Sequence, residues 1–171
     1  MKISDKLHEM LNEQIANELY SCNLYLSMAS YFLDLELNGF ANFFLVQVEE
    51  ENFHAMRQFK YLHDVDGKLI LRAIEAPQTG FKSIKNVFEI TMEHEKKVTK
   101  SINKMIQQAV KENDFATHTF LQWFVTEQVE EEATVKNILK KIEMVADNSS
   151  ALYLLNEELS RRTFQKPALW A

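Results

Sequence analysis

Four glutamates stand in the middle of four long and otherwise apolar helical patterns. Stepping along each pattern by three and four residues gives a buried stripe that a carboxylate interrupts near its middle, namely Glu18, Glu51, Glu95 or Glu131. At 1.5 Å per residue, each glutamate lies roughly 20 Å from the start of its segment. A residue at mid-helix stays at mid-bundle whichever way the helix points. The spacing therefore predicts that the four carboxylates lie at one level.

Buried carboxylates in such a group need compensating charge, because an isolated buried anion costs many kcal/mol and would normally take up a proton. A multivalent cation is the simplest compensation. His54 follows Glu51 by one helical turn, and Gln128 precedes Glu131 by the same spacing. A Glu-x-x-His pair with glutamates from neighbouring helices is the ligand set of carboxylate-bridged di-iron bundles. Oxygen ligands with an imidazole suit iron or manganese.

The elements that must position these residues are long helices. The chain of 171 residues fits one domain, and only 3 glycines and 2 prolines interrupt a sequence that is 46% hydrophobic and 26% charged. Helices are predicted over 4–33, 40–65, 83–111, from the Asn113–Asp114 break to about 145, and over about 150–164, with a tail at 165–171. The dipeptide Asn38-Gly39 is predicted to make the first turn.

The connections predict the topology. Short turns join the first helix to the second and the third to the fourth, so each pair should be antiparallel. The middle connector of about 16 residues could cover about 50 Å when extended, the length of the bundle. The second and third helices would then be parallel. The expected fold is all-α, a four-helix bundle with a long crossover between helices two and three and a short C-terminal fifth helix.

Charge and composition exclude several partners. The net charge of -6 argues against a nucleic-acid partner held by a basic face. No stretch approaches the roughly 18 apolar residues of a membrane span, and the first residues lack the apolar run of a signal peptide. Cys22 is the only cysteine, which excludes an internal disulfide. We expect a small buried thiol and a cytoplasmic location.

The stretches around these glutamates resemble the non-haem ferritins of bacteria and archaea. They are NEQIANELYSCNLYLSMA, VQVEEENFHAM, EHEKKVT and FLQWFVTEQVEEE. The similarity covers nearly the whole chain, as one ferritin-like domain over 1–171. It implies an iron storage protein with ferroxidase activity. Such a protein oxidises Fe(II) with dioxygen or peroxide at an intrasubunit di-iron centre and stores the Fe(III) mineral inside a shell of twenty-four subunits.

The resemblance also implies a role for each residue. Glu18, Glu51 and His54 would hold the first iron, and Glu51 would bridge to a second iron near Glu95. The remaining implied residues are Gln128 and Glu131 beside the second iron, Tyr25 as an electron donor, Trp123 as a weaker candidate donor or a core aromatic, and Glu50, Glu127, Glu130 and Glu131 at a third iron position. Haem is not expected, because haem-binding relatives carry Met where Asn52 stands.

Two alternatives stay open at the level of sequence. One is a non-storage di-metal carboxylate oxidoreductase, although the rubrerythrin type would need a cysteine-rich module that a single cysteine excludes. The other is a structural bundle with a buried ion network. A lone Glu-x-x-His pair is common on exposed helices, but lysine and arginine are scarce on the central stripes, which weakens the ion network.

Overall fold

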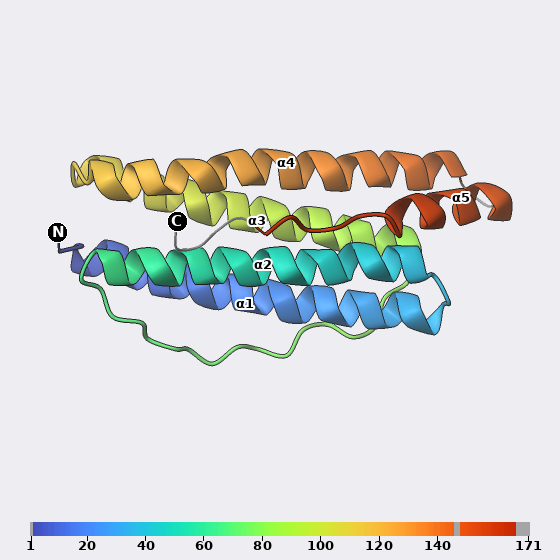
Figure 1. Ribbon diagram of the computed structural model, residues 1–171, viewed down its shortest axis with the longest axis horizontal. Helices are drawn as coiled ribbons and strands as arrows, with labels where there is room; N and C mark the ends of the chain where they lie inside the picture. The colour runs from blue at the N-terminus through green and yellow to red at the C-terminus, as the bar shows by residue number, and fades with distance from the viewer. Residues whose placement is uncertain (1, 146–147, 167–171) are drawn as a thin grey trace.

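Five helices make up the described part of the chain, residues 2–145 and 148–166 of a computed structural model (Figure 1). Their bounds are α1 Asp5–Asp34, α2 Asn38–Asp64, α3 Ile84–Lys111, α4 Phe115–Val145 and α5 Ser149–Leu159. Within those residues no strand occurs and no helix is long and apolar enough to cross a membrane. The predicted all-α class and the four long helices are confirmed.

The long connector settles the topology. α1 and α2 form one antiparallel pair and α3 and α4 the other, while the chain between α2 and α3 runs along the outside of α1 from one end of the bundle to the other (Figure 1). The backbone N–H of Ile70 donates to Asn12 Oδ1 at 2.6 Å, and Ser27 Oγ donates to the carbonyl of Gln78 at 2.6 Å. α2 and α3 are therefore parallel, as the crossover predicts.

Side chains placed just before the helices fix where four of them begin. The side chains of Ser4, Ser83, Asp114 and Asn148 each accept a hydrogen bond from the backbone N–H three residues later. An N-cap of this kind satisfies one of the N–H groups that a helix start leaves without an intrahelical partner. The predicted starts are therefore correct to within a few residues.

The first turn differs from the prediction at Asn38-Gly39. The residue with a left-handed backbone is Glu36, at φ 58°, and Asn38 already begins α2. Gly39 is needed for another reason: a Cβ built on it would lie 1.7 Å from the carbonyl oxygen of Asn156. The glycine lets α5 approach the start of α2, where Asn156 Oδ1 accepts from the Gly39 N–H at 2.8 Å.

The fifth helix is shorter than predicted, since it ends at Leu159 and not at 164. The amide of Asn42 on α2 explains the early end, because its Nδ2 donates to the carbonyls of Leu159 at 3.1 Å and Arg162 at 3.0 Å. Carbonyls at a helix end need such partners. The chain then turns back between α2 and α4, as the red segment in Figure 1 shows.

Two hydrophobic clusters fill the bundle, one toward each end. The cluster nearer α5 contains Phe32, Phe44 and Phe88, and the cluster at the opposite end contains Leu11 and Ile102. On every long helix the central glutamate falls between the residues that belong to the two clusters. The core is therefore split by a buried polar layer.

Candidate metal centre

The polar layer collects the predicted first and second iron ligands from four helices. α1 contributes Glu18, α2 contributes Glu51 and His54, α3 contributes Glu95, and α4 contributes Gln128 and Glu131. All six side chains are buried, and the most exposed of them, Glu131, retains 6% of its accessible surface. The helices thus bring these residues together in a space closed to bulk water.

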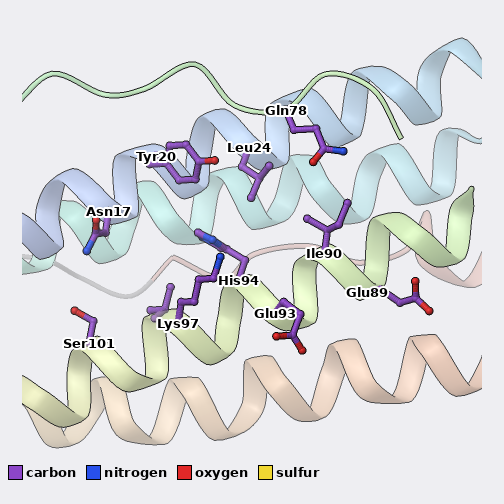
Figure 2. A pocket seen from close by; sticks show the side chains of 11 residues that line it. Asn17, Tyr20, Leu24, Gln78, Glu89, Ile90, Glu93, His94, Lys97 and Ser101 are labelled. Carbon is purple, nitrogen blue, oxygen red and sulfur yellow. The ribbon is translucent and has the colours of Figure 1, made fainter. Parts of the chain in front are cut away.

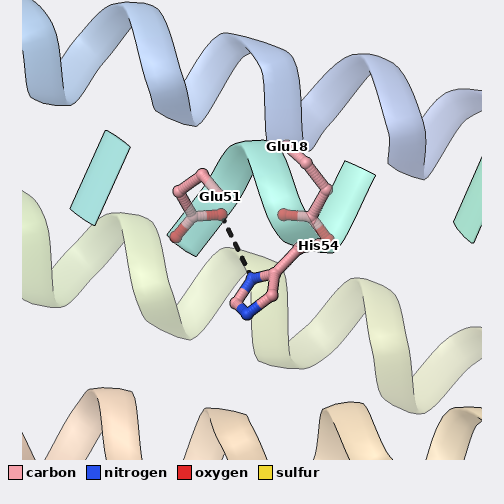
Figure 3. A group of neighbouring side chains, drawn as sticks. All are labelled: Glu18, Glu51 and His54. Atoms are coloured by element: carbon pink, nitrogen blue, oxygen red, sulfur yellow. Dashed lines mark ion pairs between the residues drawn. The ribbon is translucent and has the colours of Figure 1, made fainter. Parts of the chain in front are cut away.

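Glu18, Glu51 and His54 form a compact group in which each residue offers one ligand atom within 4.8 Å of the others (Figure 3). Two amides hold Glu18: Gln58 Nε2 donates to its Oε1 at 2.8 Å and Gln14 Nε2 donates to the same oxygen at 3.0 Å. Glu18 Oε2 is buried and has no hydrogen-bond partner among the described residues. This oxygen is therefore available to a metal ion.

His54 is held in the neutral form that can ligate a metal. Burial, with a smaller effect of Arg57, lowers its pKa to about 4. Its Nδ1 lies 3.6 Å from Glu51 Oε2, the dashed line in Figure 3, and at neutral pH this is a contact of an uncharged imidazole rather than an ion pair. Trp123 packs edge-on against the ring at 5.5 Å, with Arg57 4.3 Å over the indole, and these contacts hold the imidazole in place.

The second half of the centre is built around Glu95. The Tyr25 hydroxyl donates to Glu95 Oε1, and Gln128 Nε2 donates to Oε2 at 3.1 Å. Across the layer, Gln47 Nε2 donates to Glu131 Oε2 at 2.9 Å. Tyr25 is fully buried, and burial raises its pKa well above 10, so the hydroxyl keeps its proton and remains a donor.

Burial gives these carboxyl groups an unusual affinity for protons. It raises the pKa of Glu95 and of Glu131 to about 7, and raises that of Glu18. Burial also raises the pKa of Glu51 well above its ordinary value, with the neighbouring charges of Glu95 and Glu18 adding to the rise. In a metal-free layer these carboxyls therefore keep their protons to a higher pH than exposed carboxyls do. A divalent cation would displace those protons, because metal ligands must be deprotonated.

The predicted third position lies beside this layer on α2 and α4. The side chain of Glu50 retains 16% of its surface and is paired with Arg162, whose Nη2 lies 2.6 Å from Glu50 Oε2. Glu127 is half-buried and Glu130 is exposed. Burial raises the pKa of Glu50 to about 7, Arg162 opposes the rise, and Glu131 and Glu127 add to it, so Glu50, Glu127 and Glu131 are close enough to interact.

Several supporting residues were not predicted. Gln47 and Gln58 stand four residues outside the Glu51-x-x-His54 pair on α2, and this spacing could have revealed them. His94 is also half-buried: its Nε2 lies 2.8 Å from Ser21 Oγ, and its ring meets that of Tyr25 edge-on at 5.9 Å.

His94 lines an open groove of about 590 Å³ between α1 and α3, which also contains Tyr20 and Lys97 (Figure 2). The buried carboxylates do not line this groove. Cys22 is half-buried rather than buried, its thiol donates to the carbonyl of Val48 at 3.6 Å, and burial raises its pKa to about 11. A thiol of that pKa is unreactive at neutral pH.

Comparisons with known proteins agree with this geometry. Residues 8–145 match the family model described as a ferritin-like domain. A bacterial non-heme ferritin of Campylobacter jejuni is 39% identical over 155 residues, covering 91% of this chain and 93% of its own. One from Staphylococcus aureus is 37% identical over 164 residues, covering 96% and 99%. An open pore ferritin from Archaeoglobus fulgidus superposes with a TM-score of 0.93 at 46% identity, covering 94% of this chain and 98% of its own.

Proposed function

The chain belongs to the ferritin family, and we propose on that basis that it oxidises Fe(II) at the buried carboxylate layer and stores the ferric product. The observation that carries the proposal is the group of Glu18, Glu51 and His54, because three ligand atoms converge there and one buried carboxylate oxygen lacks a partner. Hard oxygen donors with one imidazole suit iron.

The residues divide between two ions in this proposal. Glu18 and His54 bind the first Fe(II), Glu51 bridges the pair, and Glu95 and Glu131 bind the second, with Gln128 beside it. Each Fe(II) gives up one electron, and dioxygen or peroxide takes the electrons up. The protein's own part is to release the carboxyl protons, orient the ligands and exclude bulk water. Tyr25 keeps Glu95 oriented through its hydroxyl, and as a buried phenol beside the centre it can supply an electron.

An ion network is a poorer account of the same layer. Among the described residues no lysine or arginine pairs with Glu18, Glu51 or Glu95. Glutamines, which carry no charge, supply the hydrogen bonds instead. Carboxyl groups that amides orient, and that no lysine or arginine pairs with, favour a site for an added cation over a structural salt bridge.

Storage requires many copies, and we propose that the chain forms a closed shell of twenty-four subunits. Exposed apolar side chains support assembly: Leu71 on the crossover retains 75% of its surface, and Leu154 on α5 retains 68%. Size-exclusion chromatography with light scattering tests the shell, and the mass of a single subunit would contradict storage. The third iron position at Glu50, Glu127, Glu130 and Glu131 belongs to the same proposal, and a cytoplasmic location stays a prediction.

The oxidation is tested by mixing Fe(II) with the assembled protein in air and following ferric absorbance. Replacing Glu18 or His54 with alanine should abolish the rapid phase and leave the shell intact. Glu13→Ala on α1 and His63→Ala on α2 are matched controls, since both side chains are exposed. Unchanged rates in the Glu18 and His54 variants would refute the site.

A further inference from the structure

The segment after α5 places a positive charge where the third iron position is predicted. Residues 160–166 run back between α2 and α4, and Arg162 points into the bundle surface there with 23% of its side chain exposed. Its Nη2 donates to Glu50 Oε2 at 2.6 Å, its Nη1 donates to the carbonyl of Phe43 at 3.3 Å, and its guanidinium lies 4.5 Å over the Phe43 ring. The side chain is therefore fixed at three points.

The guanidinium acts on more than one carboxylate of the third position. Burial raises the pKa of Glu50 and of Glu131 to about 7, and in both cases the charge of Arg162 opposes that rise. Glu131 also belongs to the buried layer, with 6% of its surface exposed. Arg162 thus lies at the boundary between the carboxylates of the second and third iron positions.

The backbone around Arg162 is anchored independently of the charge. Asn42 Nδ2 donates to the carbonyl of Arg162 at 3.0 Å. Two residues later, the ring of Phe164 packs edge-on against Phe53 at 5.7 Å. Contacts on both sides of Arg162 hold the segment against α2, so the position of the guanidinium does not depend on Glu50 alone.

We propose that Arg162 is a built-in cation that occupies the third iron position and must leave it before a metal ion binds there. The proposal rests on the proposed function, since it concerns the same carboxylates. A guanidinium paired with Glu50 neutralises part of the negative charge that would attract a metal ion. It also takes one of the oxygens that would ligate that ion. Arg162 is a positioning residue that makes the third site weaker than the buried pair.

Arg161 is a matched control for Arg162. Arg161 carries the same charge one residue earlier in the same turn, but its side chain is exposed. If overall charge near the segment decided metal binding, the two arginines would matter equally. If pairing with the carboxylates decides metal binding, only the substitution of Arg162 changes the affinity.

Equilibrium binding of Zn(II) to the assembled, iron-free protein tests this without relying on turnover. Arg162→Gln should tighten the weakest site per subunit about tenfold, a change of about 1.4 kcal/mol, comparable to one hydrogen bond between charged groups. Arg161→Gln should leave all affinities unchanged. Arg162→Lys keeps the positive charge but lacks the several N–H donors of the planar guanidinium. It should give an intermediate affinity.

The double variant Glu50→Gln with Arg162→Gln should lose the gain, because it removes the carboxylate that Arg162 covers. Equal affinities in wild type and Arg162→Gln, or equal gains in Arg161→Gln and Arg162→Gln, would overturn the proposal. If Arg162→Gln does not assemble, the lysine variant decides, and a wild-type affinity in it counts against the proposal. Failure of the proposed function has a different signature, namely that wild type binds no Zn(II) at the two buried sites.

Discussion

Glu95 should make the metal-free protein less stable as the pH rises toward neutrality. Burial raises its pKa to about 7 in the folded protein, from an ordinary value of 4.5. Below pH 4.5 the carboxyl is protonated in both the folded and the unfolded chain. Between 4.5 and 7 only the folded chain keeps the proton, so the free energy of unfolding falls as the pH rises, and the loss is complete above 7.

The size of the effect follows from that pKa difference. One pH unit changes the free energy of unfolding by about 1.4 kcal/mol for one group. From pH 5 to pH 7 the loss is about 2 kcal/mol for Glu95, because the slope is reduced near each of the two pKa values. For a chain of this size 1 kcal/mol corresponds to about 2–4 °C in the melting temperature, so the loss is about 4–8 °C.

Glu95→Gln removes this contribution, because the amide cannot ionise, and it also removes the charge that helps to raise the pKa of Glu51 and Glu131. His54 and His94, whose pKa values burial lowers to about 4, favour stability with rising pH over the range 4 to 6.5. Both proteins carry these histidines, so their effect cancels in the difference. Melting curves in chelator should show the difference between wild type and variant falling by about 4–8 °C from pH 5 to pH 7.

Zn(II) provides the second arm of the same experiment. Because it displaces protons from the layer, it should raise the melting temperature of wild type more at pH 7 than at pH 5. A difference between wild type and Glu95→Gln that is flat, or that rises with pH, would refute the buried, proton-bearing state of the layer.

Two further substitutions test contacts that hold α5 and the side chain of Glu95 in place. Gly39→Ala should lower stability by about 1–3 kcal/mol and expose α5 to limited proteolysis, because its methyl group would meet the carbonyl of Asn156 at 1.7 Å. Gly80→Ala is the control, since nothing lies within 4 Å of its added Cβ, and equal losses in the two would contradict the account. Tyr25→Phe should weaken Zn(II) binding at the second site about tenfold, since Glu95 loses a donor to its charged form, and an unchanged affinity would show that the hydroxyl does not orient it.

The sequence predicted the helices and the level of the glutamates because both depend on local periodicity. An apolar repeat of three and four residues defines the buried face of a helix, and Ser4, Ser83 and Asp114 mark helix starts within three residues of the repeat. Mid-helix placement then aligned Glu18 and Glu95 without any knowledge of the topology. Regular geometry is what makes such features predictable.

Features that depend on contacts between distant segments were not predictable. The early end of α5 is set by Asn42, which lies more than a hundred residues earlier in the chain. Gly39 was taken for a turn residue because its partner, Asn156, is equally remote. The half-buried position of His94 is likewise not predictable, because the residues that it contacts, Ser21 and Tyr25, lie on another helix.

The hydrogen-bond donors around the glutamates are suited to the cation site proposed for this layer. Gln14, Gln47 and Gln58 orient carboxylate oxygens of Glu18 and Glu131 but add no positive charge. Amide donors stabilise the geometry of a carboxylate without cancelling its field, so the layer keeps its shape whether protons or metal ions neutralise it. A lysine in the same place would act as a permanent counter-ion. The guanidinium that pairs with Glu50, that of Arg162, lies at the edge of this region on a segment outside the bundle helices. It is therefore placed where a fixed charge can be withdrawn without disturbing the four helices that hold the centre.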